Sequence, residues 1–372
     1  MKRISLAIAL LAIIAVAYWA FYPSKPSIIF KMQSQGPAEG SSLSNISAIT
    51  RSRDGRVLVT VIDNKKLRLW EAATGQPLRE IESTEKEWLY SPAFLPDASA
   101  YAAVDSVSAS DHQDGNVVFW NPDSGERTVT IENFNWPHAM KFNARGTLAA
   151  VGGISDLYLV DVGTHEITAK VEKAHRNGPI QALDFNASGD LLATSGRDGL
   201  VKLWHVPDLK LVRSFSVAQT VRPQRSTDGP VTVAANAVVF SHDQTLLAAS
   251  TEEASVYFWE VDTGKELQKY LGDEPGPDQS FPSGIENSLI FTTDDKWLLT
   301  TDPGGRALRF LNPRKHRDYP TAISTGSDAR IDAMDGSASD GSVAIAYREY
   351  HPGVPGPPVA KFAIWSPVPA TK

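Results

Sequence analysis

A short apolar motif that ends in a large side chain recurs along this chain, and it constrains the fold more than any other feature. Five of the nine tryptophans stand at its last position, and the spacing between copies is 40 to 55 residues. The seven copies end at Trp70, Trp120, Val160, Trp204, Trp259, Leu311 and Trp365. Units of this length that cannot bury an apolar face alone stack against their neighbours, as in solenoids and propellers.

The unit that ends at Trp204 shows how one copy is built. Its apolar runs cover residues 180–185, 191–195 and 200–204, and turns rich in Gly, Asn, Ser and Asp separate them. A fourth alternating run follows at residues 209–215. Alternation of apolar and polar residues between turn signals indicates half-buried strands. Four antiparallel strands in about forty residues make one propeller blade. The sequence therefore predicts an all-β fold, a seven-bladed propeller of four-stranded antiparallel blades.

The last unit is one strand short. Seven residues follow Trp365, and two of them are prolines, which do not suit a fourth strand. Residues 27–32, before the first unit, read as a strand and are expected to pair with the third strand of the last blade. Such pairing closes the ring and leaves no open sheet edge. The propeller is thus expected to span residues 27–369, and a chain that starts near Asn45 is expected to be unstable.

Residues 4–22 contain no charged side chain and are almost entirely apolar. That length suffices to cross a bilayer, and the basic residues before it and the aromatic ones at its end suit a membrane span. We expect a cytoplasmic stub at residues 1–3, a signal-anchor at 4–22, a linker at 23–26, and the propeller on the periplasmic side of a bacterial inner membrane. Ala15-Val16-Ala17 also fits a cleavage site, so a soluble periplasmic or secreted protein is the alternative.

These repeats resemble the WD-repeat (WD40-like) family of β-propellers over residues 27–369. Tryptophan ends five units, but the family's following Asp is replaced by Glu71, Asn121, His205, Glu260 or Ser366. The resemblance implies a buried hydrogen-bonded chain that carries over in one unit, to His175, Ser195, Asp198 and Trp204. Its role in the family is structural, although the residue types resemble a catalytic triad. Units three and six lack both the Trp and the turn Asp, and we expect apolar packing alone to hold them.

Several other functions have little support in the sequence. The net charge of −7 argues against nucleic-acid binding. Cysteine is absent, and no spacing of a zinc site, phosphate loop or nucleophile elbow is present. We therefore expect no catalytic residue, metal or cofactor. The oligomeric state is not indicated.

The long insertions all fall on one face of the expected disc, which carries the turns between second and third strands and the connections between blades. Long loops on a rigid scaffold are where binding usually occurs. We expect a non-enzymatic scaffold that binds a protein or peptide there, through residues drawn from Asp105, Asp111, His112, Arg222, Arg225, Asp273, Glu274, Arg348, Tyr350 and His351. A propeller enzyme of the hydrolase or quinoprotein type, or a binder of cell-wall polysaccharide, remains the alternative.

Overall fold

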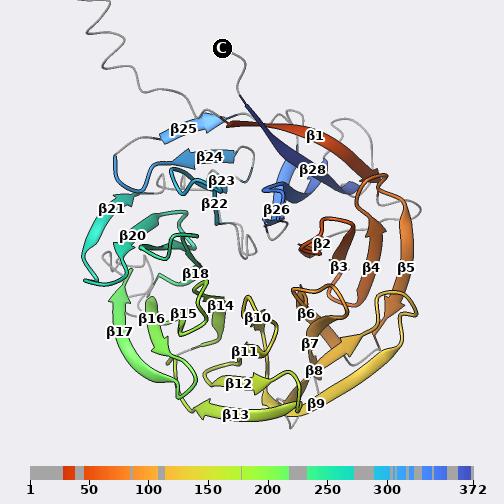
Figure 1. Cartoon of the computed structure of the whole chain (residues 1–372), viewed down its shortest axis with the longest axis horizontal. Coiled ribbons are helices and arrows are strands. Elements are labelled where there is room, and N and C mark those ends of the chain that lie inside the picture. Colours follow the sequence, from red (N-terminus) through yellow and green to blue (C-terminus); the bar gives the residue numbers. More distant parts are fainter. Residues whose placement is uncertain are drawn as a thin grey trace, which may run out of the picture.

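The computed structural model shows seven four-stranded antiparallel sheets arranged around one axis (Figure 1). It describes residues 28–37, 46–83, 87–107, 114–176, 178–217, 233–271, 289–301, 305, 308–315, 318–321, 329–336, 339–349 and 359–369. The expectation of an all-β propeller with seven four-stranded blades is confirmed. The first strand of each blade lies nearest the axis, and the last lies at the rim.

The strand bounds follow the repeats of the sequence. Blades 1 to 3 contain β2 (Ile46–Arg51), β3 (Val57–Ile62), β4 (Lys66–Glu71) and β5 (Pro77–Glu82); β6 (Glu87–Phe94), β7 (Tyr101–Val107), β8 (Asp114–Trp120) and β9 (Arg127–Asn135); and β10 (Ala139–Phe142), β11 (Leu148–Gly152), β12 (Leu157–Asp161) and β13 (Glu166–Val171). Blades 4 and 5 contain β14 (Ile180–Phe185), β15 (Leu191–Gly196), β16 (Leu200–His205) and β17 (Lys210–Ser216); and β18 (Ala235–Phe240), β19 (Leu246–Thr251), β20 (Val256–Glu260) and β21 (Glu266–Tyr270).

Blade 6 contains β22 (Ile290–Phe291), β23 (Leu298–Thr301), β24 (Leu308–Leu311) and β25 (Asp318–Thr321). Blade 7 contains β26 (Ala329–Asp335), β27 (Val343–Glu349), β28 (Val359–Pro369) and β1 (Ile28–Pro37). The sheet order β1-β28-β27-β26 makes the first strand of the chain the outer strand of the last blade.

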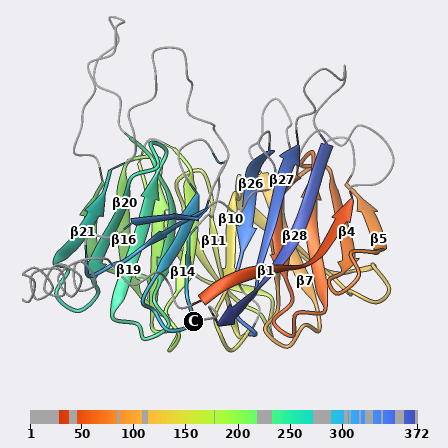
Figure 2. The same ribbon diagram turned by 90° about the horizontal axis from the view of Figure 1, so that it is seen from above.

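The ring is therefore joined by antiparallel pairing of β1 with β28, which Figure 2 shows edge-on. Ile28 lies opposite Pro369 and Pro37 lies opposite Lys361, with one irregularity between Met32 and Ser34. The paired segment includes all but the first residue of the expected 27–32 and continues five residues beyond it. Closure in this way leaves the last blade built from both ends of the propeller.

Adjacent blades are held together by apolar side chains between their sheets. Trp70 of blade 1 meets Phe362 of blade 7 with ring centroids 4.9 Å apart, and Phe215 of blade 4 meets Trp259 of blade 5 at 4.8 Å. Each fully buried aromatic side chain of this kind contributes about 1.5–3 kcal/mol by its removal from water. The tryptophan repeat of the sequence thus corresponds to the packing between blades.

Chain direction gives the disc two distinct faces. We call the face with the turns between first and second strands and between third and fourth strands the short-turn face. The opposite face carries the turns between second and third strands and the connections between blades, and we call it the long-loop face. Gly55 and Gly189 occupy equivalent short turns with φ of 74° and 78°, a conformation that favours glycine.

Within the described ranges, the structure contains no helix long and apolar enough to cross a membrane. Residues 1–3, the expected signal-anchor at residues 4–22 and the linker at residues 23–26 lie outside these ranges.

Candidate functional site

Three of the four residues expected to form a buried polar chain in blade 4 are joined in the structure. His175, in the connection before β14, bonds through Nδ1 to Asp198 Oδ1 at 2.8 Å. Its Nε2 lies 2.7 Å from Thr194 Oγ1, which accepts a hydrogen bond from Trp204 Nε1 at 2.9 Å. With a neutral His175, every hydrogen bond in the chain has a donor and an acceptor. Trp204 Nε1–H donates to Thr194 Oγ1, the Thr194 hydroxyl donates to His175 Nε2, and His175 Nδ1–H donates to Asp198. The arrangement links the strands of one blade.

The hydroxyl in this chain belongs to Thr194, so the expectation for Ser195 was wrong. Trp204 pairs with Leu192 across the sheet, and Thr194 lies two residues further along β15, on the same face as the indole. Ser195 points to the other face, where its buried Oγ has no hydrogen-bond partner among the described residues. Blade 1 contains the same hydrogen bond between an indole and a threonine, since Trp70 Nε1 donates to Thr60 Oγ1 at 2.9 Å.

Burial sets the protonation states of this chain. Burial lowers the pKa of His175 below its ordinary value, against the opposing influence of Asp198. Burial acts to raise the pKa of Asp198, but its hydrogen bond to His175 and two backbone donors hold that pKa below the ordinary value. A neutral histidine beside an ionised carboxylate satisfies every donor and acceptor in the chain.

Blade 3 is also braced by polar groups, so the expectation of apolar packing alone was wrong for this unit. Asp156, directly before β12, accepts hydrogen bonds from the backbone N of Lys173 at 3.0 Å and from Ser155 Oγ at 2.9 Å. Tyr158 donates to its second carboxylate oxygen at 3.4 Å and accepts from the backbone N of Asn135 at 3.1 Å. The equivalent turn of blade 6 lies largely outside the described residues.

Asp105 was expected to be a partner-binding residue on a long loop, and the structure corrects this. It lies within β7, which continues to Val107, and it is fully buried. Its Oδ1 accepts hydrogen bonds from the backbone N and the side-chain Nδ2 of Asn116, at 2.9 and 2.8 Å. The carboxylate therefore fixes the pairing of β7 with β8 and does not face a partner.

Arg348 was also expected on a long loop, and the structure places it in a strand. It lies in β27, which extends to Glu349, and its guanidinium makes a two-pronged ion pair with buried Asp332 at 2.7 and 2.6 Å. This pair joins the second strand of blade 7 to the inner strand. The other eight residues expected to contact a partner lie outside the described residues: Asp111, His112, Arg222, Arg225, Asp273, Glu274, Tyr350 and His351.

Aromatic rings on the described part of the long-loop face come from the start of blade 2 and from the connection between blades 2 and 3. Trp88 is 43% exposed near the start of β6, and Lys65 Nζ sits 5.3 Å from the centroid of its ring. His138 stacks on Trp136 with centroids 5.8 Å apart and contacts Tyr90 at 5.2 Å. We call these five residues the aromatic patch.

The backbone holds the aromatic patch in an unusual conformation. Trp136 has a φ of 43°, which is uncommon for a bulky residue and costs about 1–3 kcal/mol. The next residue, Pro137, packs so closely on Gly115 that a Cβ at Gly115 would lie 2.4 Å from Pro137 Cδ. Burial lowers the pKa of His138, so at neutral pH the lysine carries the only positive charge of the patch.

A cavity of about 630 Å³ lies on the axis and opens on the short-turn face. The inner strands of all seven blades and the turns after them line it. One residue of each inner strand stands at the same register in this lining, and we call the set the inner ring: Thr50, Ala93, Lys141, Asp184, Val239, Ile290 and Asp335. A volume of this size is typical of small-ligand sites.

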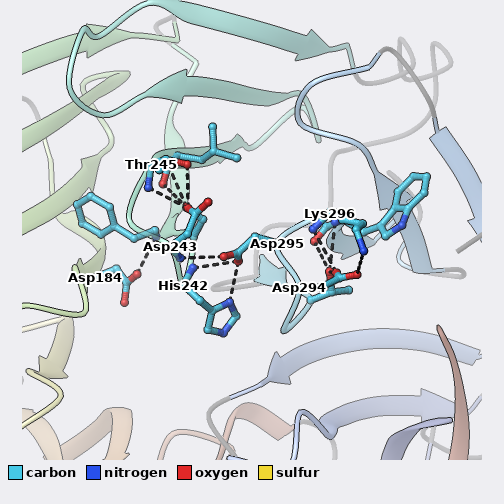
Figure 3. Close-up of polar contacts among 12 residues, drawn as sticks. Asp184, His242, Asp243, Thr245, Asp294, Asp295 and Lys296 are labelled. Carbon is cyan, nitrogen blue, oxygen red and sulfur yellow. Dashed lines mark hydrogen bonds and ion pairs between the residues drawn. The ribbon is translucent and has the colours of Figure 1, made fainter. Parts of the chain in front are cut away.

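Carboxylates of the short-turn face also link neighbouring blades, as Figure 3 shows for blades 4 to 6. Asp184 Oδ2 accepts from the backbone N of Phe240 at 2.8 Å. Asp295 accepts from the backbone N and the Nδ1 of His242, at 2.9 and 2.8 Å, and from the backbone N of Asp243 at 2.8 Å. Across the ring closure, Asp335 Oδ2 accepts from the backbone N of Arg51 at 2.8 Å.

The aromatic patch and the axial cavity were both missed from the sequence. Each gathers residues from different blades, so no local spacing reveals it. A signal existed for the cavity: aligned units place Lys141, Asp184 and Asp335 at one register of otherwise apolar inner strands. Among the described residues, no group of three or more His, Asp or Glu side chains is placed to hold a metal ion.

Comparison with known proteins agrees with the repeat architecture. Residues 168–205, which cover most of blade 4, match the model of the family described as WD domain, G-beta repeat. Protein ROOT INITIATION DEFECTIVE 3 of Arabidopsis thaliana is 24% identical over 63% of this chain and 49% of its own length. Pre-mRNA-processing factor 19 of Oryza sativa subsp. japonica is 32% identical over 47% of this chain and 28% of its own length.

SIR4-interacting protein SIF2 of Saccharomyces cerevisiae is 22% identical over 45% of this chain and 32% of its own length. The chain thus spans less than half the length of each of these three relatives. All three are eukaryotic proteins, and they give no support to a bacterial type. The repeat match in blade 4 and the seven four-stranded blades together support a WD-repeat β-propeller.

Proposed function

We propose that this protein is a non-enzymatic interaction scaffold that binds a protein or peptide partner through its long-loop face, with the aromatic patch as the anchor. The observation that carries the proposal is the exposure of Trp88 beside Lys65, two residues before Tyr90, which contacts His138. Tryptophan and tyrosine are among the side chains that dominate the energetics of protein interfaces. A rigid ring presents them without further ordering of the backbone.

The relatives agree with a partner of this class. One is described as a SIR4-interacting protein and another, from Schizosaccharomyces pombe, as a target of rapamycin complex subunit. These descriptions concern proteins that associate with other proteins. For this chain they support a protein partner without identifying it.

Capture of partners by the full chain tests the proposal. Trp88→Ala removes the most exposed ring of the aromatic patch, and Leu211→Ala provides a matched control on the outer strand β17, where Leu211 is also exposed. We expect at least one protein retained by the unchanged chain and by L211A to fall about tenfold or more with W88A, since an aromatic anchor contributes about 2 kcal/mol or more. Identical retention by both variants would contradict the proposal.

We further propose that residues 4–22 tether the propeller to a membrane, with the blades on the outer side. The support is the uncharged apolar run itself. β1 begins at Ile28 beside Pro369, at the short-turn end of blade 7, so a tether there places the short-turn face toward the membrane. Extraction of membranes at alkaline pH tests the anchor: the full chain should stay in the pellet. Release into the supernatant would contradict it.

A further inference from the structure

The axial cavity is separate from the aromatic patch, because it opens on the opposite face of the disc. Its wall is charged at the inner ring, which supplies one ammonium group and two carboxylates. The other four members of that ring are Thr50, which is weakly polar, and the apolar residues Ala93, Val239 and Ile290. A ligand in this cavity therefore meets both charge and apolar surface.

Asp184 is the best placed of these groups to bind a ligand. Its side chain is 14% exposed, and in the described part of the chain it receives one hydrogen bond, from the backbone N of Phe240. An ionised carboxylate offers about four acceptor positions. Lys141 Nζ lies 3.8 Å from Asp184 Oδ1, beyond hydrogen-bond distance, and its side chain is 46% exposed. Acceptor positions thus remain for a further donor.

The other cations of the cavity are engaged elsewhere or lie at its outer edge. The Arg51 guanidinium donates to Gly55 O at 2.9 and 2.6 Å and to Ser342 Oγ, at the contact of blades 7 and 1. His242 is bonded to Asp295, and Arg53 is exposed in the turn at the mouth. Burial raises the pKa of Asp184 in spite of Lys141, which is consistent with a carboxylate that lacks sufficient positive charge nearby.

We propose that the axial cavity binds an alkylguanidinium or alkylammonium group, whose cationic head donates hydrogen bonds to Asp184 and whose apolar stem packs against Val239 and Ile290. Asp335, at the same register in blade 7, adds negative charge to the same lining. This chemistry occurs in free amines and in the arginine and lysine side chains of peptides. The short-turn face thus carries a second binding site, independent of the partner on the long-loop face.

Calorimetric titration of the full chain tests the site. The free form of the ligand is represented by n-butylguanidinium and the peptide form by an acetylated, amidated Ala-Arg-Ala tripeptide. Their uncharged counterparts are n-butylurea and the citrulline tripeptide. We expect millimolar or tighter binding of a guanidinium probe and binding of its urea counterpart that is weaker by about tenfold or more. Tighter binding of the tripeptide than of n-butylguanidinium would identify a peptide source, and the reverse would identify a free amine.

Substitutions locate the binding within the cavity. Asp184→Asn keeps an acceptor for the Phe240 N–H but removes the charge, and it should weaken guanidinium binding about tenfold. Asp294→Asn, in a turn of the same face outside the cavity lining, should leave binding unchanged. Lys141→Met removes the competing cation and should strengthen binding several-fold. Melting curves of the three variants show whether each remains folded.

Three results would overturn the proposal. The first is the absence of guanidinium binding by the unchanged chain at millimolar concentration. The second is equal affinity of folded D184N and the unchanged chain. The third is weaker guanidinium binding by K141M together with tighter binding of n-butylsulfonate than of n-butylguanidinium, which would assign the cavity to anions.

Discussion

Ala103 in blade 2 occupies the position at which blades 1 and 4 carry a threonine beneath the tryptophan. Trp120 pairs with Tyr101, and Ala103 lies two residues further along β7, just as Thr194 lies two residues beyond Leu192. Without a hydroxyl there, the buried Nε1 of Trp120 has no hydrogen-bond partner among the described residues. A buried donor left in this state costs about 1–3 kcal/mol.

Ala103→Ser should therefore stabilise the protein. The serine hydroxyl supplies an acceptor for Trp120, and we expect a gain of about 1 kcal/mol in the free energy of unfolding, or about 1–2 °C in the thermal midpoint. Ala193→Ser places a hydroxyl among apolar side chains between blades 4 and 5 and should lower the midpoint. Calorimetric melting compares the two, and an equal decrease in both would refute the assignment.

His175 should make stability depend on pH. Its pKa is lowered in the folded state, so between its folded value and about 6.5 the unfolded chain binds the proton and the folded chain does not. Stability is therefore fully present above about pH 6.5 and falls as the pH is lowered through this window. Protonation of His175 at Nε2 would also direct an N–H of the imidazole ring at the hydroxyl of Thr194, which donates to that nitrogen when the histidine is neutral.

Melting between pH 7 and 5 tests this dependence. The midpoint of the unchanged chain should fall, and His175→Gln should reduce the slope. His138 contributes in the same direction, because burial lowers its pKa as well. A slope that is unaffected by H175Q would show that His175 does not control it.

At the residue level the sequence indicated a polar chain in blade 4 but not all of its members. The residues His175, Asp198 and Trp204 follow from the repeat motif, because their positions relative to turns and strand ends are regular. The choice between Thr194 and Ser195 depends on which face of β15 each side chain occupies. The strand register determines that face, and two adjacent hydroxyl residues in a sequence do not reveal the register.

Among the elements, β1 has the clearest consequence for stability. Deletion of residues 1–44 removes the outer strand of blade 7 and exposes the edge of β28 over the nine residue pairs from Ile28↔Pro369 to Pro37↔Lys361. We expect a loss of several kcal/mol, because backbone hydrogen bonds contribute about 0.5–1.5 kcal/mol each. Deletion of residues 1–27 keeps β1 and should leave the melting temperature unchanged. The same midpoint in both truncated chains would rule out the closure.

Element boundaries were predicted well where apolar alternation is strong and less well where polar residues continue a strand. Two of the long insertions expected on one face of the disc, residues 104–114 and 347–358, read as loops from the sequence. The structure continues β7 through Asp105 and β27 through Arg348, since Asn116 donates hydrogen bonds to Asp105 and Asp332 forms an ion pair with Arg348 inside the sheet. A polar residue can therefore continue a strand when a residue of a neighbouring strand bonds its side chain. The residue type alone does not reveal that bonding partner.

Across the whole molecule, the two faces should act independently. Trp88→Ala is expected to reduce partner capture without changing the affinity for n-butylguanidinium, and Asp184→Asn is expected to do the opposite. The reason is that the two residues lie on opposite faces of a ring held rigid by buried contacts between blades. Measurement of both properties on both variants checks this, and a change of both properties by one variant would indicate coupling.

The ring itself could be predicted from the sequence, because seven repeats and one missing strand determine the number of blades and their closure. The axial cavity could not, since its chemistry depends on seven side chains that lie about 40 to 55 residues apart and meet only when the ring is closed. The aromatic patch has the same origin, with Lys65, Trp88 and Trp136 drawn from separate units.

The pairing of β1 with β28 also determines how the ring responds to mechanical force. Ile28 and Pro369 are opposite each other at one end of the ladder. Tension applied between these two residues therefore acts first on this single pair and separates the two strands one residue pair at a time. Single-molecule stretching from residues 28 and 369 should therefore open blade 7 first.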